Sequence, residues 1–201
     1  MIRLPAEPSL FVAAIAVLTL GGTLLAAEFH VDTEADRIVK FVSDAPFEDF
    51  DGTTDRIDGY IIWDGDTLIS NGAELAGADF YFEVELDGLD TGIGLRNRHM
   101  REKYLETHDY PYVSFAGSVV HAIPSGNGGY SAETVGTFDL HGVKRERTLE
   151  VRIEPDSSGY LVTSSFDVSL KDHDIEIPKL MFLKINEIIA VEISFALKRV
   201  K

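Results

Sequence analysis

Residues 90–115 run DTGIGLRNRHMREKYLETHDYPYVSF, and this stretch is the most informative part of the sequence. It opens on a Thr-Gly turn, passes through a charged segment and ends on a Tyr-Pro pair that leads into an apolar strand. Within it, Leu95, His99 and Met100 are spaced so that they can share one face of a helix. The pattern predicts a short helix, about residues 95–105, that interrupts a domain of strands and covers one end of it.

Around that segment the sequence alternates between apolar and polar residues with a period of two. Phe80, Phe82, Val84 and Leu86 alternate with a tyrosine and three acidic residues. The same alternation recurs in the segments that begin near residues 138, 149, 162 and 189. A period of two predicts half-buried antiparallel strands with one apolar face.

Turn residues separate these segments and set the number of strands. Pairs such as Asp87-Gly88 and the glycine-rich run at residues 125–129 allow tight reversals, and several of these turns predict hairpins. About eight or nine strands result. A sheet of that size with one apolar face either closes into a barrel or packs as a sandwich, because its edges otherwise stay open. The alternation alone does not choose between the two.

A resemblance to a known family makes that choice. It rests on residues 90–115 and on a second stretch, residues 136–144, which run GTFDLHGVK. The order of turn, helix and Tyr-Pro pair in the first stretch, and the strand, turn and strand of the second, resemble the YceI-like family of lipocalin-like polyisoprenoid-binding proteins. The resemblance extends more weakly over about residues 29–200. In one departure from the family's usual pattern, Asn97 stands where an acid commonly precedes the histidine.

The resemblance implies both a fold and a function. The fold is all-β: an antiparallel lipocalin-like β-barrel of about eight strands, with the short helix near one end, formed by residues 28–201. The function is that of a carrier that encloses a polyisoprenoid, such as a quinone side chain or a prenyl phosphate, for storage or transport. A fold of this kind hosts many functions, so the ligand follows from the resemblance less directly than the barrel does.

The apolar phases of the strands indicate which side chains would line such a barrel. Each buried methylene contributes about 0.8 kcal/mol gross, so a few isoprene units suffice for micromolar binding, which needs about 8 kcal/mol net. In the alternative interpretation the same side chains fill a solid core, and the domain is a stress-related or interaction module outside the cytoplasm. The predicted lipid-binding residues are Phe80, Phe82, Val84, Phe115, Phe138, Leu140, Phe166, Val191, Ile193 and Phe195.

The predicted helix carries four positive charges, at Arg96, Arg98, Arg101 and Lys103. They either pair with nearby acids, as charged helix faces commonly do, or form a patch that meets an anionic head group at the barrel mouth. Under the second interpretation, Arg96, Arg98 and His99 are the head-group candidates.

No catalytic or metal-binding motif stands out. The sequence has neither an H-E-x-x-H pair nor a G-x-S-x-G nucleophile elbow. The nearest approach to a metal cluster is Asp172-His173-Asp174, but consecutive side chains of an extended backbone face opposite ways. We therefore expect no enzyme, no metal and no required cofactor.

Residues 1–27 differ in kind from the rest. The stretch from Pro8 to Ala27 has no charged residue, Arg3 supplies a positive start, and Ala26-Ala27 are small residues ahead of Glu28. This predicts a cleaved signal peptide and a periplasmic or secreted protein. The alternative is an uncleaved hydrophobic anchor helix, because the run is about long enough to span a bilayer. The chain has no cysteine, which excludes disulfides and a lipid-modified cysteine.

The formal net charge of −16 limits the choice of partners. Such a surface repels phosphate backbones, so we expect no nucleic acid. The expected partner is an isoprenoid lipid. A transient membrane contact and a homodimer both stay open.

Overall fold

The structure is a computed structural model that describes residues 26–43, 50–64, 75–126, 128–157, 159–177, 179–180 and 183–200. Residues 1–25 of the predicted leader lie outside the described residues. In the part of the chain that is described, no helix is long and apolar enough to cross a membrane.

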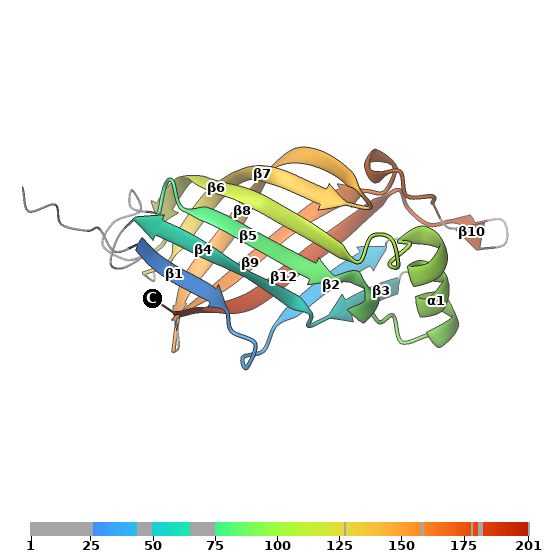
Figure 1. Cartoon of the computed structure of the whole chain (residues 1–201), viewed down its shortest axis with the longest axis horizontal. Helices are drawn as coiled ribbons and strands as arrows, with labels where there is room; N and C mark the ends of the chain where they lie inside the picture. The colour runs from blue at the N-terminus through green and yellow to red at the C-terminus, as the bar shows by residue number, and fades with distance from the viewer. Residues whose placement is uncertain are drawn as a thin grey trace, which may run out of the picture.

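The described chain is mostly β-sheet (Figure 1). Eight antiparallel strands hydrogen-bond in a ring, in the order β1-β4-β5-β6-β7-β8-β9-β12, and β12 pairs back with β1. The ring confirms the closed barrel and excludes the sandwich. Its strands are β1 (Ala26–Val31), β4 (Ile57–Asp64), β5 (Asp79–Glu85), β6 (Tyr112–Pro124), β7 (Tyr130–Leu140), β8 (Val143–Asp156), β9 (Gly159–Ser169) and β12 (Ile188–Arg199).

The predicted alternation accounts for the strands of the ring. In β5, Phe80 and Val84 are buried, and the glutamate and tyrosine side chains between them lie on the other face. Strands β7 and β8 are joined by the two-residue turn His141-Gly142, whose φ angles are 54° and 73°. Two positive φ angles in succession are the geometry of a type I′ hairpin, which fits the twist of paired strands.

Four short strands lie outside the ring. β2 (Ile38–Ser43) pairs with the first half of β12, and β3 (Phe50–Thr54) pairs with β2. The remaining pair, β10 (Lys179–Leu180) and β11 (Leu183–Lys184), forms a separate two-stranded sheet. The sequence did not predict β3, because Phe-Asp-Gly-Thr-Thr has no apolar alternation.

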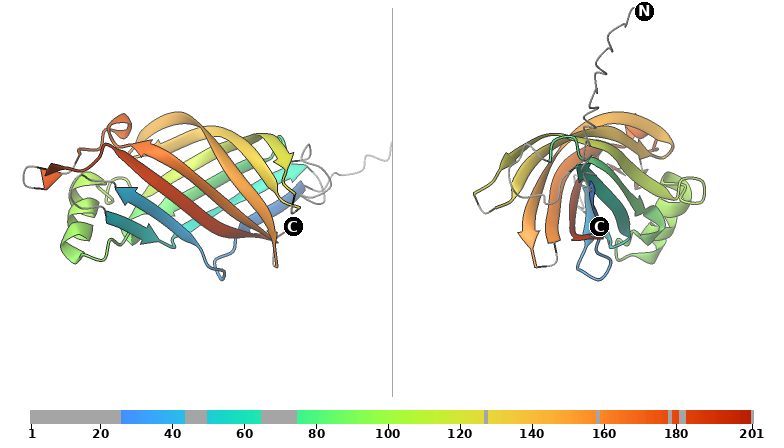
Figure 2. Two further views of the ribbon diagram at one scale, coloured as in Figure 1. Left: turned by 180° about the vertical axis from the view of Figure 1, so that it is seen from behind. Right: turned by 60° about the vertical axis from the view of Figure 1, so that its left-hand side comes forward.

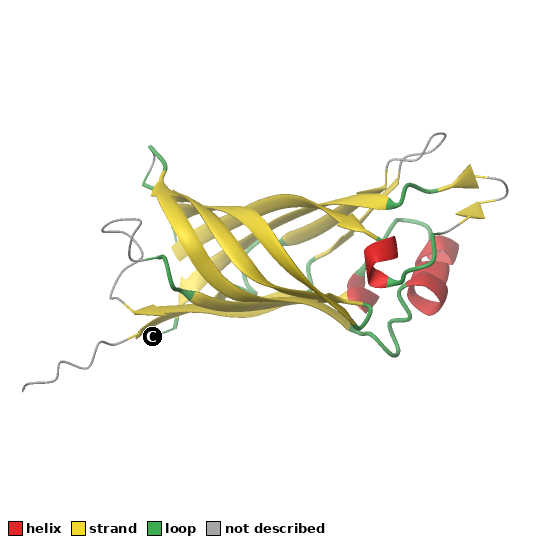
Figure 3. Ribbon diagram, turned by 90° about the horizontal axis from the view of Figure 1, so that it is seen from above, coloured by secondary structure: helices red, strands yellow, loops and turns green. Residues whose placement is uncertain are grey.

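The helical segments gather at one end of the barrel (Figure 3). They are the 3₁₀ turns η1 (Leu86–Gly88) and η3 (Lys171–His173), the α-helix α1 (Gly94–His99) and the π-helical turn η2 (Met100–Tyr104). Together α1 and η2 cover nearly the span predicted for a single helix. The C-terminus and the start of β1 lie at the opposite end (Figures 1 and 2). β1 begins at Ala26, inside the predicted leader, so cleavage before Glu28 would remove its first two residues.

Candidate functional site

A cavity of about 670 Å³ runs inside the barrel and reaches α1 and η2. The ten side chains that the alternation predicted as lining all border it: Phe80, Phe82, Val84, Phe115, Phe138, Leu140, Phe166, Val191, Ile193 and Phe195. Strands from opposite sides of the ring thus present their apolar faces to the same space. The volume lies within the range of about 300–1,000 Å³ that is usual for ligand sites.

The exposure of the inward-facing side chains shows that this space is unfilled. Phe82, Phe115 and Phe166 are only partly buried, although they line the cavity and pack against the buried core. A protein interior without cavities is packed as densely as an organic crystal, and aromatic rings inside it have no accessible surface. A solid core, as the alternative interpretation required, does not fit this arrangement.

The wall of the cavity offers few polar groups along its length. The Thr134 hydroxyl donates to the Leu149 carbonyl at 2.9 Å, and the Ser164 hydroxyl donates to the Glu150 carbonyl at 2.6 Å. Both hydroxyls therefore bond to the backbone of β8. The larger polar side chains of the lining, from Arg96, His99 and Tyr104, come from α1 and η2 at the mouth.

Aromatic packing closes the barrel at the end away from the helix. The rings of Phe29 and Trp63 stack with centroids 4.6 Å apart, and Tyr160 lies 5.4 Å from Phe29. All three side chains are buried, and none of them borders the cavity. The cavity therefore has an apolar floor and a mouth of mixed chemistry.

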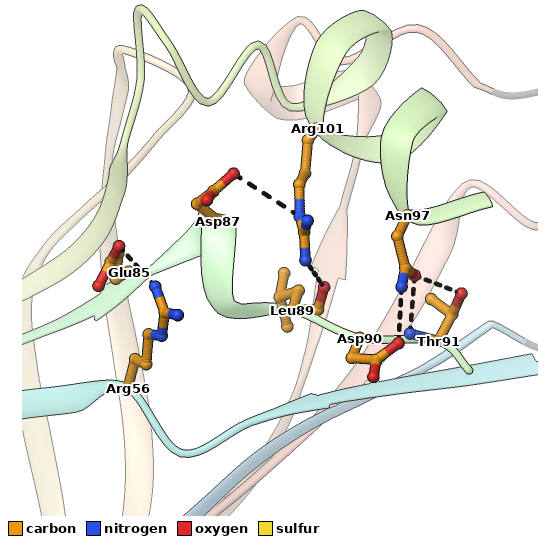
Figure 4. Close-up of polar contacts among 8 residues, drawn as sticks. All are labelled: Arg56, Glu85, Asp87, Leu89, Asp90, Thr91, Asn97 and Arg101. Carbon is orange, nitrogen blue, oxygen red and sulfur yellow. Dashed lines mark hydrogen bonds and ion pairs between the residues drawn. The ribbon is translucent and has the colours of Figure 1, made fainter. Parts of the chain in front are cut away.

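Asn97 ties α1 to the loop that precedes it (Figure 4). Its amide nitrogen donates to the Asp90 carboxylate at 2.6 Å, and its amide oxygen accepts from the backbone N–H and the hydroxyl of Thr91 at 2.9 and 2.7 Å. The bond from Asn97, with one from the Gly92 N–H at 2.8 Å, holds the pKa of Asp90 below its ordinary value. Asn97, which stands where the family commonly has an acid, thus supplies both a hydrogen-bond donor and a hydrogen-bond acceptor.

Further contacts fix the same corner to the barrel. Arg101 donates to the Leu89 carbonyl at 2.8 Å and lies 3.7 Å from the Asp87 carboxylate (Figure 4). The backbones of Thr53 in β3 and Asp90 exchange two hydrogen bonds, of 3.0 and 2.9 Å. The helical cover is consequently held at several points.

The three head-group candidates separate on the helix. Arg96 and His99 border the cavity, and the Arg96 guanidinium lies 4.6 Å from the centre of the Phe50 ring. Arg98 is exposed and borders a second depression, on the outer side of the helix, together with Arg101 and acidic side chains. The helical period explains the split, because positions 96, 99 and 100 share a face that position 98 does not. The position of Arg98 agrees with the alternative in which it lies among acids.

The sequence prediction missed part of the lining. Ile57 and Ile61 of β4 border the cavity, but Gly59 interrupts their alternation. Gly59 has a φ of 143°, and a Cβ there would lie 2.2 Å from the Tyr81 carbonyl oxygen. Leu149 and Val162, by contrast, lay on phases that the alternation had already identified.

His173 does not border the cavity but packs against Phe138, which does. It is 1% exposed, its Nδ1 lies 3.1 Å from the Val143 carbonyl oxygen, and its ring is roughly perpendicular to the Phe138 ring, with centroids 5.4 Å apart. Burial lowers the pKa of His173 below its ordinary value. The neighbouring Asp172 and Asp174 are exposed, so the three side chains do not converge.

Comparisons with known proteins agree with this geometry. The family model of the YceI-like domain matches residues 29–197. No curated protein matches the chain.

Several solved structures share the fold. Burkholderia cenocepacia BcnA is 14% identical with a TM-score of 0.66, over 82% of this chain and 98% of that one. A polyisoprenoid binding domain from Saccharophagus degradans, implicated in plant cell wall breakdown, is 18% identical with a TM-score of 0.66, over 85% and 97%. The Campylobacter jejuni YceI protein is 12% identical with a TM-score of 0.52, over 75% and 84%. At such identities the likeness shows the fold alone.

Proposed function

The chain belongs to the YceI-like domain family, and from that premise we propose that it is an exported, non-enzymatic protein that encloses a polyisoprenoid or a similar long apolar chain. Storage or transport of that chain is the corresponding role. The periplasm, or the medium outside the cell, is the compartment that the leader supports.

The observation that carries the proposal is the apolar cavity, with its closed floor and its mouth beneath α1. At about 30 Å³ for each heavy atom, roughly the share of a water molecule in the liquid, 670 Å³ holds about 22 carbon atoms. That is about four isoprene units. The similarity to a polyisoprenoid binding domain supports the same ligand class.

The polar side chains at the mouth suggest how the ligand lies. An apolar tail would extend toward the Phe29 and Trp63 floor, because the walls offer it hydrocarbon contacts and few groups that need water. The head group would remain near Arg96 and His99, where a guanidinium can donate to quinone or phosphate oxygens.

Two alternatives predict other features. An interaction module with a filled core would lack the cavity. An enzyme would gather reactive polar groups in it, whereas the hydroxyls of Thr134 and Ser164 are committed to backbone carbonyls.

Native mass spectrometry of the protein purified from its own host, followed by organic extraction, tests the proposal. We expect a mass above that of the bare chain and an extractable isoprenoid. A bare mass with nothing to extract would contradict it.

A pair of variants shows whether the lipid occupies the cavity. Ile193→Trp puts a larger side chain into the lining, while Glu192→Trp adds the same side chain to an exposed position on the opposite face of β12. We expect Ile193→Trp to reduce lipid loading and Glu192→Trp to leave it unchanged. Equal loading of the two folded variants would place the ligand elsewhere.

A further inference from the structure

The wall of the barrel is incomplete between β8 and β9. The two strands, both labelled in Figure 1, pair from Asp156–Gly159 to Val151–Ser164 and then stop pairing. Beyond that point β8 continues to pair with β7, and β9 continues to pair with β12. Residues 143–150 and 165–169, all of them described, have no backbone pairing with one another.

Side chains bound this opening, which we call the β8–β9 window. At one end the Ser164 hydroxyl donates to the Glu150 carbonyl. At the other end Arg145 donates to the Asp172 carbonyl at 3.0 Å. Between them Arg147 donates to the Asp167 carbonyl at 2.7 Å. In this part of the wall, side-chain hydrogen bonds therefore take the place of the backbone ladder that joins β8 and β9 further along.

The cavity lies directly behind the window. Leu149 on one edge and Phe166 on the other both border the cavity. The Arg147 guanidinium lies 5.8 Å from the ring centres of Phe138 and of Phe166. The residue that spans the window thus also covers two rings of the lining.

The window is held by fewer bonds than the helical cover of the mouth. To shift that cover, α1 must lose the bonds of Asn97 to Asp90 and Thr91, and η2 must lose the bond of Arg101 to Leu89. In the middle of the window, the partly exposed Arg147 is joined to a carbonyl of exposed Asp167 by one hydrogen bond. A hydrogen bond that solvent can reach is readily exchanged for one to water.

We propose that the β8–β9 window is a side entrance through which a slender apolar chain reaches the cavity, and that Arg147 is its latch. The proposal rests on the proposed function, since it needs an apolar ligand. A latch that swings aside changes the rates of entry and exit together. It leaves the equilibrium nearly unchanged, because it stands outside the bound state.

Stopped-flow fluorescence with cis-parinaric acid, an unbranched C18 chain, tests the latch. In Arg147→Met, which keeps a long stem but removes the donor and the charge, we expect association and dissociation rates to rise at least fivefold, with Kd changed less than twofold. The matched control is Arg152→Met, an exposed position on β8 where the ladder to β9 is intact. Its rates should equal those of the unaltered protein.

Cross-linking gives the converse test. The chain has no cysteine, so Thr148→Cys and Asp167→Cys, two exposed positions on facing edges of the window, can be joined by a short bis-maleimide. The bridged protein should exchange the probe at least fivefold more slowly than the same variant before bridging.

Unchanged rates in both experiments would overturn the side entrance, and so would a rise in dissociation rate alone with a weaker Kd, which would make Arg147 a ligand contact. Failure of the unaltered protein to bind the probe would count against the proposed function itself.

Discussion

Ligand length gives the sharpest quantitative prediction. A cavity for about 22 carbon atoms takes about four isoprene units (about 30 Å³ per heavy atom), and the aromatic floor at Phe29 and Trp63 prevents a longer tail from passing through. Each enclosed unit of five carbons contributes about 3–4 kcal/mol gross. Ordering its rotatable bonds offsets about 1 kcal/mol of this. We therefore expect a net gain of about 2–3 kcal/mol per unit up to the fourth.

Isothermal titration with prenyl monophosphates of one to six units measures this directly, because the head group stays constant along the series. Affinity should rise about 30- to 150-fold per unit and then change less than about threefold beyond the fourth, as further units remain in water. In Ile193→Trp the plateau should begin about one unit earlier, whereas Glu192→Trp should keep the original series. An affinity independent of length, or one that climbs steadily through six units, would refute a closed cavity of this volume.

Three further predictions concern the framework of the site. Asn97→Asp removes the donor to Asp90 and sets two acids together, so the free energy of unfolding should fall by about 1–2 kcal/mol, which urea denaturation measures; an unchanged midpoint would contradict the role of the amide. Because burial lowers the pKa of His173, the unfolded chain binds the proton more readily, so stability should be complete above pH 6.5 and decline below it by at most about 1.4 kcal/mol per pH unit. In His173→Leu the stability should decline less steeply below pH 6.5, and a pH profile identical to that of the unaltered protein would contradict the role of His173. Gly59→Ala should lower the thermal midpoint markedly, because its Cβ would collide with the Tyr81 carbonyl oxygen; an unaltered melting curve would show that β4 is wrongly placed.

Much of the barrel could be predicted because half-buried strands record their orientation in alternate residues. The ten predicted lining residues were found on the phases of β5, β6, β7, β9 and β12, and all ten border one cavity. Whether they touch lipid stays a prediction. Alternation assigns a face, but it does not show whether opposing faces meet. Only the closed barrel shows that the aromatic side chains of Phe82 and Phe115 keep accessible surface.

Other features could not be predicted, for physical reasons that differ. β3 forms because β2 and Asp90 offer it backbone partners, and its own composition gives no sign of these partners. Gly59 conceals the lining role of its neighbours, since a residue needed for close backbone approach breaks the apolar pattern. The β8–β9 window depends on where two strands diverge, and both strands retain normal alternation there.

A crystal structure of the protein purified from its own host tests the central claim most directly, because it shows what the space inside the barrel contains. We expect continuous, elongated density that extends from near Arg96 and His99 at the mouth past Phe115 and Ile193 toward the floor. A barrel whose side chains have closed together, with no room for a chain, would contradict the account.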